Sequence, residues 1–357
     1  MHKNILITGG AGFVGSALAL ALRRAHPDAN ITAFDNLRRR GSEVNLPRLK
    51  AEGIRFVHGD VRNLQDLAEI RPAPDLILEC SAEPSVLAGY GGSPDYLIHT
   101  NLTGCFHCLE LARLAKADFL FVSTSRVYPV APINNLAYAE TDTRFQLLPE
   151  QSIAGASEYG ISEEFPLHGA RSLYGMTKLA AELMVAEYGD AYGIRIAIDR
   201  CGLLTGPWQM AKADQGVIAF WVAAHCLERS LKYIGFGGSG KQVRDFLHID
   251  DFCDLILDQL ANFDLYAGRH WNVGGGVTNS LSLLEATALC REVTGRTVDV
   301  VSSTENRPAD LRLYLTDHRA VSAVNGWRPR RDARQTLTDI ATWIDGHTDT
   351  LRDVLFS

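Results

Sequence analysis

The chain has 357 residues, of which 46% are hydrophobic and 22% charged, which is enough for a full hydrophobic core and for two lobes. Its net charge of -7, from 35 Lys and Arg against 42 Asp and Glu, excludes the basic excess that nucleic-acid binding needs. Seven cysteines without regular spacing indicate the reducing cytoplasm. The apolar run Phe13–Leu22 falls short of the roughly 20 residues that cross a bilayer, so we expect no membrane segment or targeting peptide.

Short apolar runs alternate with helical patterns in the first half of the chain. Helical patterns cover 13–24 and 96–115. The runs that we expect to be strands are 5–8, 31–35, 54–58, 76–80 and 119–124. Continuous apolar strands are typical of parallel sheets that are buried on both faces. The pattern therefore predicts an α/β fold with a doubly wound parallel sheet.

The pattern weakens after Tyr128, and residues 129–172 show no sustained period. A connection of this length in a compact domain predicts a functional insertion. A helix over 173–188 and a sixth strand over 195–200 follow. Helical patterns then mix with short strands, at 215–229, 250–260, 281–293 and 332–345. We predict a larger lobe over 1–207, insertion included, and a smaller lobe over 208–357 with some segments returning to the sheet.

A glycine-rich turn follows the first predicted strand directly. Gly9 permits the tight turn, Gly12 lets the backbone approach a pyrophosphate, and Gly15 permits close packing of the helix on the sheet. The N-terminus of the next helix offers N–H groups to that anion. Asp35 ends the second strand, where its carboxylate would accept hydrogen bonds from ribose hydroxyls and repel a 2′-phosphate. The pattern predicts a dinucleotide site, with NAD as the cofactor.

The run Arg38-Arg39-Arg40 leaves a second interpretation of this site open. An arginine near the adenosine ribose can accept the 2′-phosphate of NADP, whereas a solvated charge run has no such role. NAD remains the prediction because of Asp35.

Tyr174 and Lys178 lie four residues apart on one predicted helix and therefore share a face. An ammonium beside a phenol favours the phenolate, which suits Tyr174 for general acid and base work. Together with the glycine turn, this pair resembles the extended class of the short-chain dehydrogenase/reductase superfamily over essentially the whole chain. The resemblance implies a hydroxyl at the end of strand 119–124. Alignment on Val127-Tyr128 selects Thr124, with Ser123 and Ser125 as its neighbours.

The same resemblance implies further contacts. Cofactor contacts would come from Gly9, Gly12, Phe13, Val14, Gly15, Asp35, Asn36, Asp60, Val61, Ser81, Ala82, Tyr174 and Lys178. Substrate contacts would come from Glu83, Arg126, Arg244, Arg307 and Asp310, with the arginines at 244 and 307 on a diphosphate. Related enzymes pair through the helices that correspond to 96–115 and 173–188, so we expect a homodimer or tetramer.

Two other motifs carry no site in our interpretation. Gly235–Lys241 has the spacing of a triphosphate-binding loop, but Gln242 follows where Ser or Thr would hold magnesium, and no obvious helix begins there. Cys105-Phe106-His107-Cys108 lies inside a helical pattern without a second cysteine pair, so helix packing is favoured over a metal site. We expect no metal.

The residues at the end of strand 119–124 reduce the number of possible reactions. Dehydratases of this superfamily resemble Thr-Asp-Glu there, whereas this chain has Thr124-Ser125-Arg126, and a cationic arginine cannot do the work of an acidic pair. Three stretches resemble the CDP-paratose 2-epimerases: 35–46, 79–86, and 200–210 with its continuation at 214–217.

That resemblance implies a CDP-linked deoxyhexose, inverted at C2 through a transient 2-keto sugar, for bacterial surface polysaccharide. The C2 hydrogen has no neighbouring carbonyl and is not acidic, so oxidation followed by reduction is the workable route. A CDP-glucose 2-epimerase, a UDP-glucose 4-epimerase-like enzyme and an NAD-binding regulator remain alternatives.

Overall fold

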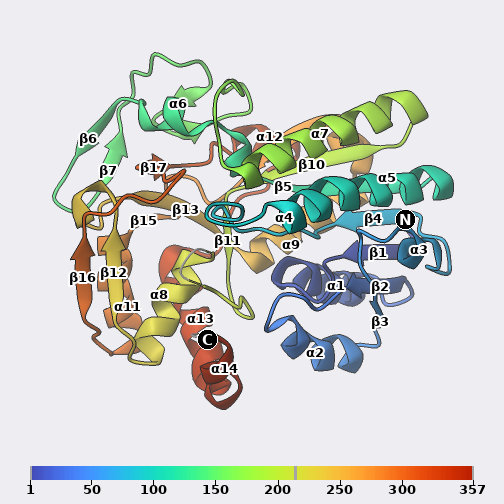
Figure 1. Ribbon diagram of the computed structural model, residues 1–357, viewed down its shortest axis with the longest axis horizontal. Coiled ribbons are helices and arrows are strands. Elements are labelled where there is room, and N and C mark those ends of the chain that lie inside the picture. Colours follow the sequence, from blue (N-terminus) through green and yellow to red (C-terminus); the bar gives the residue numbers. More distant parts are fainter. Residues whose placement is uncertain (1, 213–214, 356–357) are drawn as a thin grey trace. The chain divides into compact units, whose positions relative to one another are not determined.

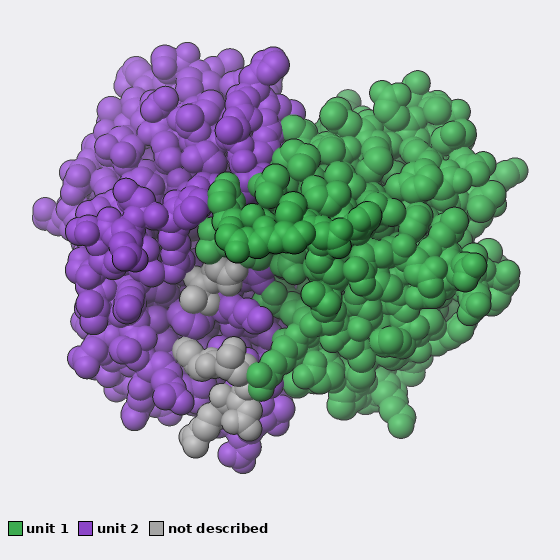
Figure 2. Space-filling view, viewed as in Figure 1, with its two compact units in different colours: residues 1–124, 173–200, 252–271 green, residues 125–172, 201–251, 272–357 purple. Residues whose placement is uncertain are grey.

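The computed structural model describes residues 2–212 and 215–355, so Asp214 of the stretch 214–217 lies outside the described residues. The chain forms two compact units, which Figure 2 colours separately. The first consists of 1–124, 173–200 and 252–271, and the second of 125–172, 201–251 and 272–357. This division differs from a single boundary at residue 207, because the chain passes between the units several times.

A seven-stranded sheet forms the centre of the first unit, in the order β14-β10-β5-β4-β1-β2-β3 (Figure 1). The strands are β1 (Asn4–Thr8), β2 (Asn30–Asp35), β3 (Arg55–His58), β4 (Leu76–Glu79), β5 (Asp118–Thr124), β10 (Ile196–Cys201) and β14 (Arg269–Val273). From β3 to β5 the neighbouring strands pair in parallel. The strand order reverses its direction between β1 and β4, which makes this a doubly wound, Rossmann-type sheet. Ligands of such sheets bind at the carboxyl ends of the strands beside this reversal.

Helices cover the sheet of the first unit. They are α1 (Phe13–Ala25), α2 (Leu46–Ala51), α3 (Leu64–Ala68), α4 (Asp95–Ile98), α5 (Gly104–Ala115), α7 (Leu173–Tyr192), α9 (Ile249–Ala261) and α10 (Phe263–Tyr266), with a short 3-10 turn at Ser42–Asn45. Helix α1 packs against β1 and β2, while α5 and α7 pack against each other and against β4 and β5. Their apolar faces and the strands form one buried core, to which Phe119, Phe121 and Leu109 belong. Burial of this apolar area is the main stabilising contribution.

The predicted elements of this unit are confirmed, with most ends displaced by one or two residues. Helix α7 continues to Tyr192 instead of ending near 188. The helix predicted over 96–115 is interrupted by a π-type turn at His99–Thr103, which separates α4 from α5. Such turns are rare in proteins, and those that occur often lie at functional sites.

The second unit holds a smaller sheet and a helical layer (Figure 1). The smaller sheet consists of β11 (Leu203–Thr205), β13 (Val243–His248), β15 (Ser280–Ser282) and β17 (Leu313–Tyr314). A separate two-stranded sheet consists of β12 (Leu231–Ile234) and β16 (Val300–Ser303). Its main helices are α8 (Val217–Cys226), α11 (Leu283–Thr294), α12 (Arg319–Asn325), α13 (Ala333–Gly346) and α14 (Thr348–Leu355). Helices α8, α11 and α13 pack on one another. Helix α11 begins with a capping box between Ser282 and Glu285, which satisfies N–H groups that the helix leaves unpaired.

The insertion 129–172 belongs to the second unit and has little regular structure. A 3-10 turn (Ser125–Val127) precedes it, and it contains α6 (Val130–Asn134) and two antiparallel hairpins. The hairpin strands are β6 (Tyr138–Glu140), β7 (Phe145–Leu147), β8 (Ala156–Ser157) and β9 (Gly160–Ile161). The glycine-rich stretch 235–241 contains a 3-10 turn (Phe236–Gly238) and leads into strand β13 rather than a helix. A triphosphate-binding loop would open a helix, so its rejection is consistent with the structure.

Candidate functional site

The glycine turn lies between β1 and α1 at the carboxyl edge of the sheet. Gly9 has φ of 62°, a left-handed conformation that disfavours side chains. A Cβ on Gly15 would lie 2.2 Å from the Gly9 carbonyl oxygen, so the first turn of α1 packs on the turn itself. The close approach to the sheet comes instead from Gly10, whose Cβ would lie 2.6 Å from Cα of Ala33 in β2. We did not name Gly10 from the sequence, although the Gly9-Gly10 doublet was a signal for it.

The N-terminus of α1 fits a dinucleotide pyrophosphate. The N-cap residue Gly12 has no side chain to bond the first N–H groups of the helix. A Cβ there would meet only the Gly9 carbonyl oxygen, at 3.1 Å, so this face of the turn is sterically open to a ligand. Helix N–H groups carry partial positive charge, which favours an anion.

Asp35 at the end of β2 supports the same turn. Its carboxylate accepts hydrogen bonds from the backbone N–H groups of Ala11 at 3.1 Å and Leu37 at 2.8 Å. Burial raises the pKa of Asp35, and these backbone donors oppose the rise. A carboxylate has about four acceptor positions, so ribose hydroxyls can still be accepted.

Asn36 and Asp60, both predicted cofactor contacts, are brought together. The Asn36 amide donates to the Asp60 carboxylate at 2.9 Å. Burial opposes ionisation there, but hydrogen bonds from Arg62 and Asn36 lower the pKa of Asp60 to about 2. The Arg38 guanidinium lies 3.9 Å from the ring centroid of Tyr96, with Arg62 at 4.7 Å. Arg38 is therefore engaged in a cation–π contact rather than being a purely solvated charge.

The predicted hydroxyl position is at the end of β5. Thr124 is buried there, and the preceding residue Ser123 donates to the Glu182 carboxylate at 2.5 Å. Successive side chains of a strand point to opposite faces. Glu182 also pairs with Arg200 at 2.7 Å, so the Ser123 hydroxyl belongs to a buried structural network. Thr124, whose side chain points to the other face of β5, stays the predicted position of the reacting hydroxyl.

Tyr174 and Lys178 lie on the first turns of α7, and both are buried. The Lys178 Nζ lies 3.8 Å from the ring centroid of Phe121 in β5. It also lies 3.9 Å from a carboxylate oxygen of Glu79, the last residue of β4. Ser81, a predicted cofactor contact, donates its hydroxyl to the other Glu79 oxygen. Our sequence reasoning missed Glu79, which looked like one more residue of a buried strand.

The loop after β4 carries Ala82 and Glu83 and is held by a buried asparagine. The Asn101 side chain accepts from the Glu83 N–H at 2.8 Å and donates to the Thr177 hydroxyl of α7 at 3.0 Å. The Glu83 carboxylate accepts from the Ser85 N–H at 3.1 Å, within its own loop. Asn101 lies in the π-type turn, a distortion that no helical periodicity reveals. Asn101 therefore links the loop after β4 to α7, and we did not predict this role from the sequence.

Val61 differs from the other predicted cofactor contacts in that its side chain belongs to the hydrophobic core. Its side chain is buried in the hydrophobic core, and its carbonyl oxygen bonds the His107 ring at 2.8 Å. Phe13 and Val14 form the partly exposed start of α1.

Four of the predicted substrate contacts belong to the second unit. The Arg244 guanidinium donates to the Asp310 carboxylate at 3.1 Å and to the Leu311 carbonyl at 2.7 Å. Arg126 donates to the Ala309 carbonyl at 3.0 Å, so it reaches the same segment. Arg307 lies three residues before Asp310, and its carbonyl oxygen accepts a hydrogen bond from the Asp310 N–H at 3.4 Å. The structure thus groups Arg126, Arg244 and Asp310 around 307–312.

The insertion is attached to that segment. Asn134 at the end of α6 donates to the Asp310 carbonyl at 3.0 Å and accepts from the Arg312 N–H at 2.8 Å. The Arg312 guanidinium lies 4.4 Å from the ring centroid of Tyr138 in the first hairpin. The insertion therefore braces the backbone that carries the candidate diphosphate groups.

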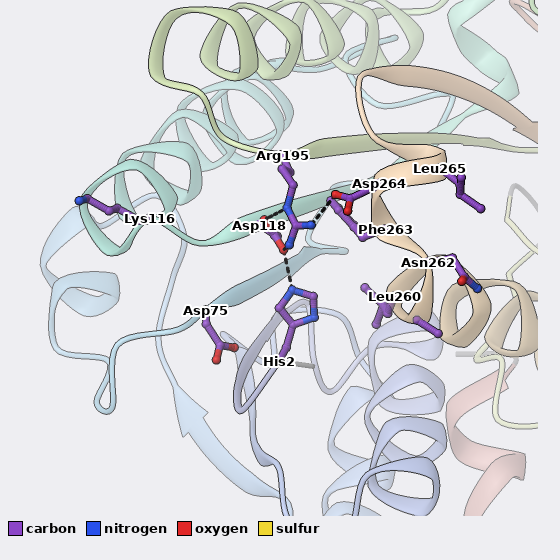
Figure 3. Close-up of a pocket in the computed structure, with 11 residues that line it drawn as sticks. His2, Asp75, Lys116, Asp118, Arg195, Leu260, Asn262, Phe263, Asp264 and Leu265 are labelled. Carbon is purple, nitrogen blue, oxygen red and sulfur yellow. Dashed lines mark hydrogen bonds and ion pairs between the residues drawn. The ribbon is translucent and has the colours of Figure 1, made fainter.

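A pocket of about 710 Å³ lies at the opposite edge of the sheet in the first unit (Figure 3). Arg195 lies between Asp118 and Asp264 there, and His2 contacts Asp118 at 2.6 Å. Burial opposes ionisation, but the bonds with His2 and Arg195 lower the pKa of Asp118. His2 and Arg195 precede β1 and β10, and Asp118 is the first residue of β5. The pocket therefore lies at the amino ends of the strands, opposite the edge where doubly wound sheets bind their ligands.

Comparison with known proteins agrees with this geometry. The model of the NAD dependent epimerase/dehydratase family matches residues 5–274. The chain belongs to this family. It is 30% identical to a CDP-paratose 2-epimerase of Salmonella typhi over 352 residues, covering 95% of this chain and 98% of the relative. A dTDP-glucose 4,6-dehydratase of Mycolicibacterium smegmatis is 29% identical, covering 95% of this chain and 92% of the relative.

Solved structures of the same fold extend the comparison. A dTDP-glucose 4,6-dehydratase of Streptomyces venezuelae, a double mutant with NAD bound, has a TM-score of 0.80 at 26% identity, covering 98% and 99% of the two chains. A UDP-glucose 4-epimerase of Thermus thermophilus in complex with NAD has a TM-score of 0.78 at 24% identity, covering 96% of this chain and 99% of the other.

This member of the NAD-dependent epimerase/dehydratase family uses NAD as its cofactor, and the residues of the first unit fit it. The open glycine turn, the N–H groups of α1 and the Asp35 carboxylate are the donors and acceptors that a dinucleotide needs. Among the residues that the structure describes, no helix is both long and apolar enough to span a bilayer.

Proposed function

We propose that this enzyme is an epimerase that inverts C2 of a CDP-linked deoxyhexose of the CDP-paratose type. The observation that carries the proposal is the likeness to a CDP-paratose 2-epimerase over almost the full length of both chains. Dehydratases are also among the relatives. The sequence Thr124-Ser125-Arg126 argues against dehydration, because it offers no acidic pair after β5.

In the proposed mechanism, Tyr174 and Lys178 do the proton chemistry. Tyr174 accepts the proton of the C2 hydroxyl as that carbon is oxidised, and returns it when the carbon is reduced. Lys178 favours the phenolate form of Tyr174, and Thr124 donates a hydrogen bond to the carbonyl oxygen of the 2-keto sugar. NAD, when bound, supplies the hydride acceptor and then the donor. The net reaction is redox-neutral because the hydride taken from C2 is returned to C2, and the configuration inverts because the sugar presents its other face before reduction.

Arg244 and Arg307 would hold the diphosphate while the sugar turns. Guanidinium groups suit phosphate oxygens because they donate two parallel hydrogen bonds. Asp310 contacts Arg244 and would orient it, while Glu83 and Arg126 would contact the sugar nucleotide. We propose that the product serves bacterial surface polysaccharide and that the enzyme works in the cytoplasm. None of the seven cysteines, all within the described residues, forms a disulfide.

The substrate is tested by incubating the purified holoenzyme with CDP-paratose, CDP-glucose and UDP-glucose and assigning product stereochemistry by NMR. The proposal expects inversion at C2 of CDP-paratose. If the enzyme preferred to invert C2 of CDP-glucose, the proposed substrate would change to CDP-glucose. Inversion at C4 of UDP-glucose alone would replace the proposal, and no turnover of any of the three would favour an NAD-binding regulator.

Reaction in deuterated water tests the hydride route. We expect no deuterium at C2 of the product, because the hydrogen removed from this carbon returns without exchange with solvent. Mass and NMR analysis of the product measures this directly. Substantial deuterium at C2 would instead indicate proton exchange and would remove the redox route.

We also propose that the enzyme forms homodimers through α5 and α7. Apolar side chains on these helices are exposed: Phe106, Leu114, Met176, Leu183 and Tyr192. Such exposure is costly in water unless a partner covers it. Sedimentation analysis should give a dimer or tetramer for the natural chain and a smaller species for Leu183→Glu, at a residue 63% exposed. A natural chain that sediments as a monomer would contradict the pairing.

A further inference from the structure

A buried acidic side chain lies beside the proposed acid–base pair. Glu79 is 1% exposed and ends β4, the strand beside the reversal of strand order. One of its oxygens is bonded by the Ser81 hydroxyl. The other, Oε2, has no hydrogen-bond partner among the described residues and lies 3.9 Å from the Lys178 Nζ. The carboxylate therefore uses one oxygen for local structure and turns the other toward the ammonium.

The separation of 3.9 Å decides the type of interaction. It is too long for a hydrogen bond, so the three N–H donors of Lys178 are not used by Glu79. It lies at the outer limit of an ion pair, but the two charges still attract each other because a protein interior screens charges less than water does. Glu79 therefore acts on Lys178 by charge and leaves its donors available to ligands and neighbours.

Lys178 is held from two strands. The ring centroid of Phe121 in β5 lies 3.8 Å from its ammonium, and a carboxylate oxygen of Glu79 in β4 lies 3.9 Å from it. With the Lys178 side chain only 3% exposed, an unpaired ammonium here would be strongly unfavourable. We therefore take Glu79 as ionised. Burial raises the pKa of its carboxyl group, but the Lys178 ammonium opposes that rise.

The titratable and hydrogen-bonding groups around Glu79 come from several elements. Lys178 on α7 is a cation close to Glu79, and Tyr174 lies one turn before it on the same helix. The other groups are the hydroxyls of Thr8 and Ser81 and the thiols of Cys80, Cys105 and Cys108. Burial, with Glu79 as a lesser cause, raises the pKa of all three thiols, so they remain neutral and cannot balance the Lys178 charge.

We propose that Glu79 is a positioning residue that fixes the Lys178 ammonium and offsets part of its charge, so that Tyr174 titrates at a higher pH than Lys178 alone would set. The inference deepens the proposed function and rests on it for the role of Tyr174. The sign follows from charge. An uncompensated ammonium stabilises the phenolate more strongly, so removal of the Glu79 charge lowers the pKa of Tyr174.

The test titrates Tyr174 without using substrate. Ultraviolet difference absorbance of tyrosinate is recorded against pH for the NAD-loaded enzyme. The signal of the matching Tyr174→Phe variant is subtracted, which isolates one of the 11 tyrosines. Glu79→Gln keeps the shape of the side chain and removes its charge. We expect its Tyr174 titration to move to lower pH by about one unit, as for loss of one nearby charge.

Two further variants separate the charge from a packing effect. Glu79→Met is a second neutral replacement and should move the titration in the same direction, whereas Glu79→Asp keeps the charge and should stay close to the natural enzyme. An unchanged or upward titration in a folded, NAD-loaded neutral variant overturns the inference, whatever its activity. Failure of all three sugar nucleotides to react, with the downward shift present, would overturn the proposed substrate and leave the role of Glu79 intact.

Discussion

The Tyr174→Phe variant is expected to keep its NAD and to lose nearly all turnover of the sugar nucleotide. The substitution removes only the phenolic oxygen, so the ring still fills its buried place on α7. General acid–base groups contribute about 10²–10⁴-fold in rate, and kcat should fall by that order. The measurement is the initial rate of epimerisation, with bound NAD determined after denaturation of the same preparation.

Tyr188→Phe provides the matched control. Tyr188 lies on the same helix, and its hydroxyl donates to the Glu110 carboxylate at 2.8 Å, within the α5 and α7 pair. Loss of this bond should leave kcat almost unchanged and lower stability by about 1 kcal/mol. If Tyr174→Phe retained full activity, Tyr174 would not be the acid–base group.

The Gly15→Ala variant is expected to lose its tightly bound NAD. An added Cβ would lie 2.2 Å from the Gly9 carbonyl oxygen and 2.8 Å from the Gly10 Cα. Both contacts are with backbone, so the turn or the start of α1 must move, and the N–H groups that face the pyrophosphate move with it. Overpacking of this kind costs about 1–3 kcal/mol of stability. Cofactor content of the purified protein and its midpoint of thermal unfolding measure the two effects.

Gly346→Ala is the control for Gly15→Ala. An added Cβ at the end of α13 meets no atom within 4 Å. This variant should keep its full content of NAD and its thermal stability. A Gly15→Ala protein with the same NAD content as the natural chain would show that the turn tolerates displacement, and would remove Gly15 from the cofactor site.

Features that depend on neighbours in the chain could be predicted well. The apolar runs gave the strands of the Rossmann-type sheet, because a strand buried on both faces needs apolar residues throughout. The glycine turn was recognisable because it follows a strand and opens a helix within a few residues. The Tyr174 and Lys178 pair follows from helical periodicity alone, since residues four apart share a face.

Features that depend on residues far apart in the chain could not be predicted from the sequence. Glu79 and Lys178 meet because β4 lies next to β5, on which α7 packs, and no local pattern encodes that order. Position 10 has no room for a side chain, because Ala33 of the neighbouring strand β2 passes close to Gly10. Asn101 acts through a π-type turn that interrupts a helix whose periodicity looked continuous.

The sequence by itself determined the sheet type and the dinucleotide turn, because each is a short-range requirement of backbone geometry. It also predicted Tyr174 and Lys178 for proton transfer, from helix spacing together with the family resemblance. Only the tertiary structure decided which parts of the chain form each unit, how the insertion is tied to 307–312, and that a buried carboxylate accompanies the lysine. These depend on strand order and side-chain packing, which result from burying apolar surface over the whole chain.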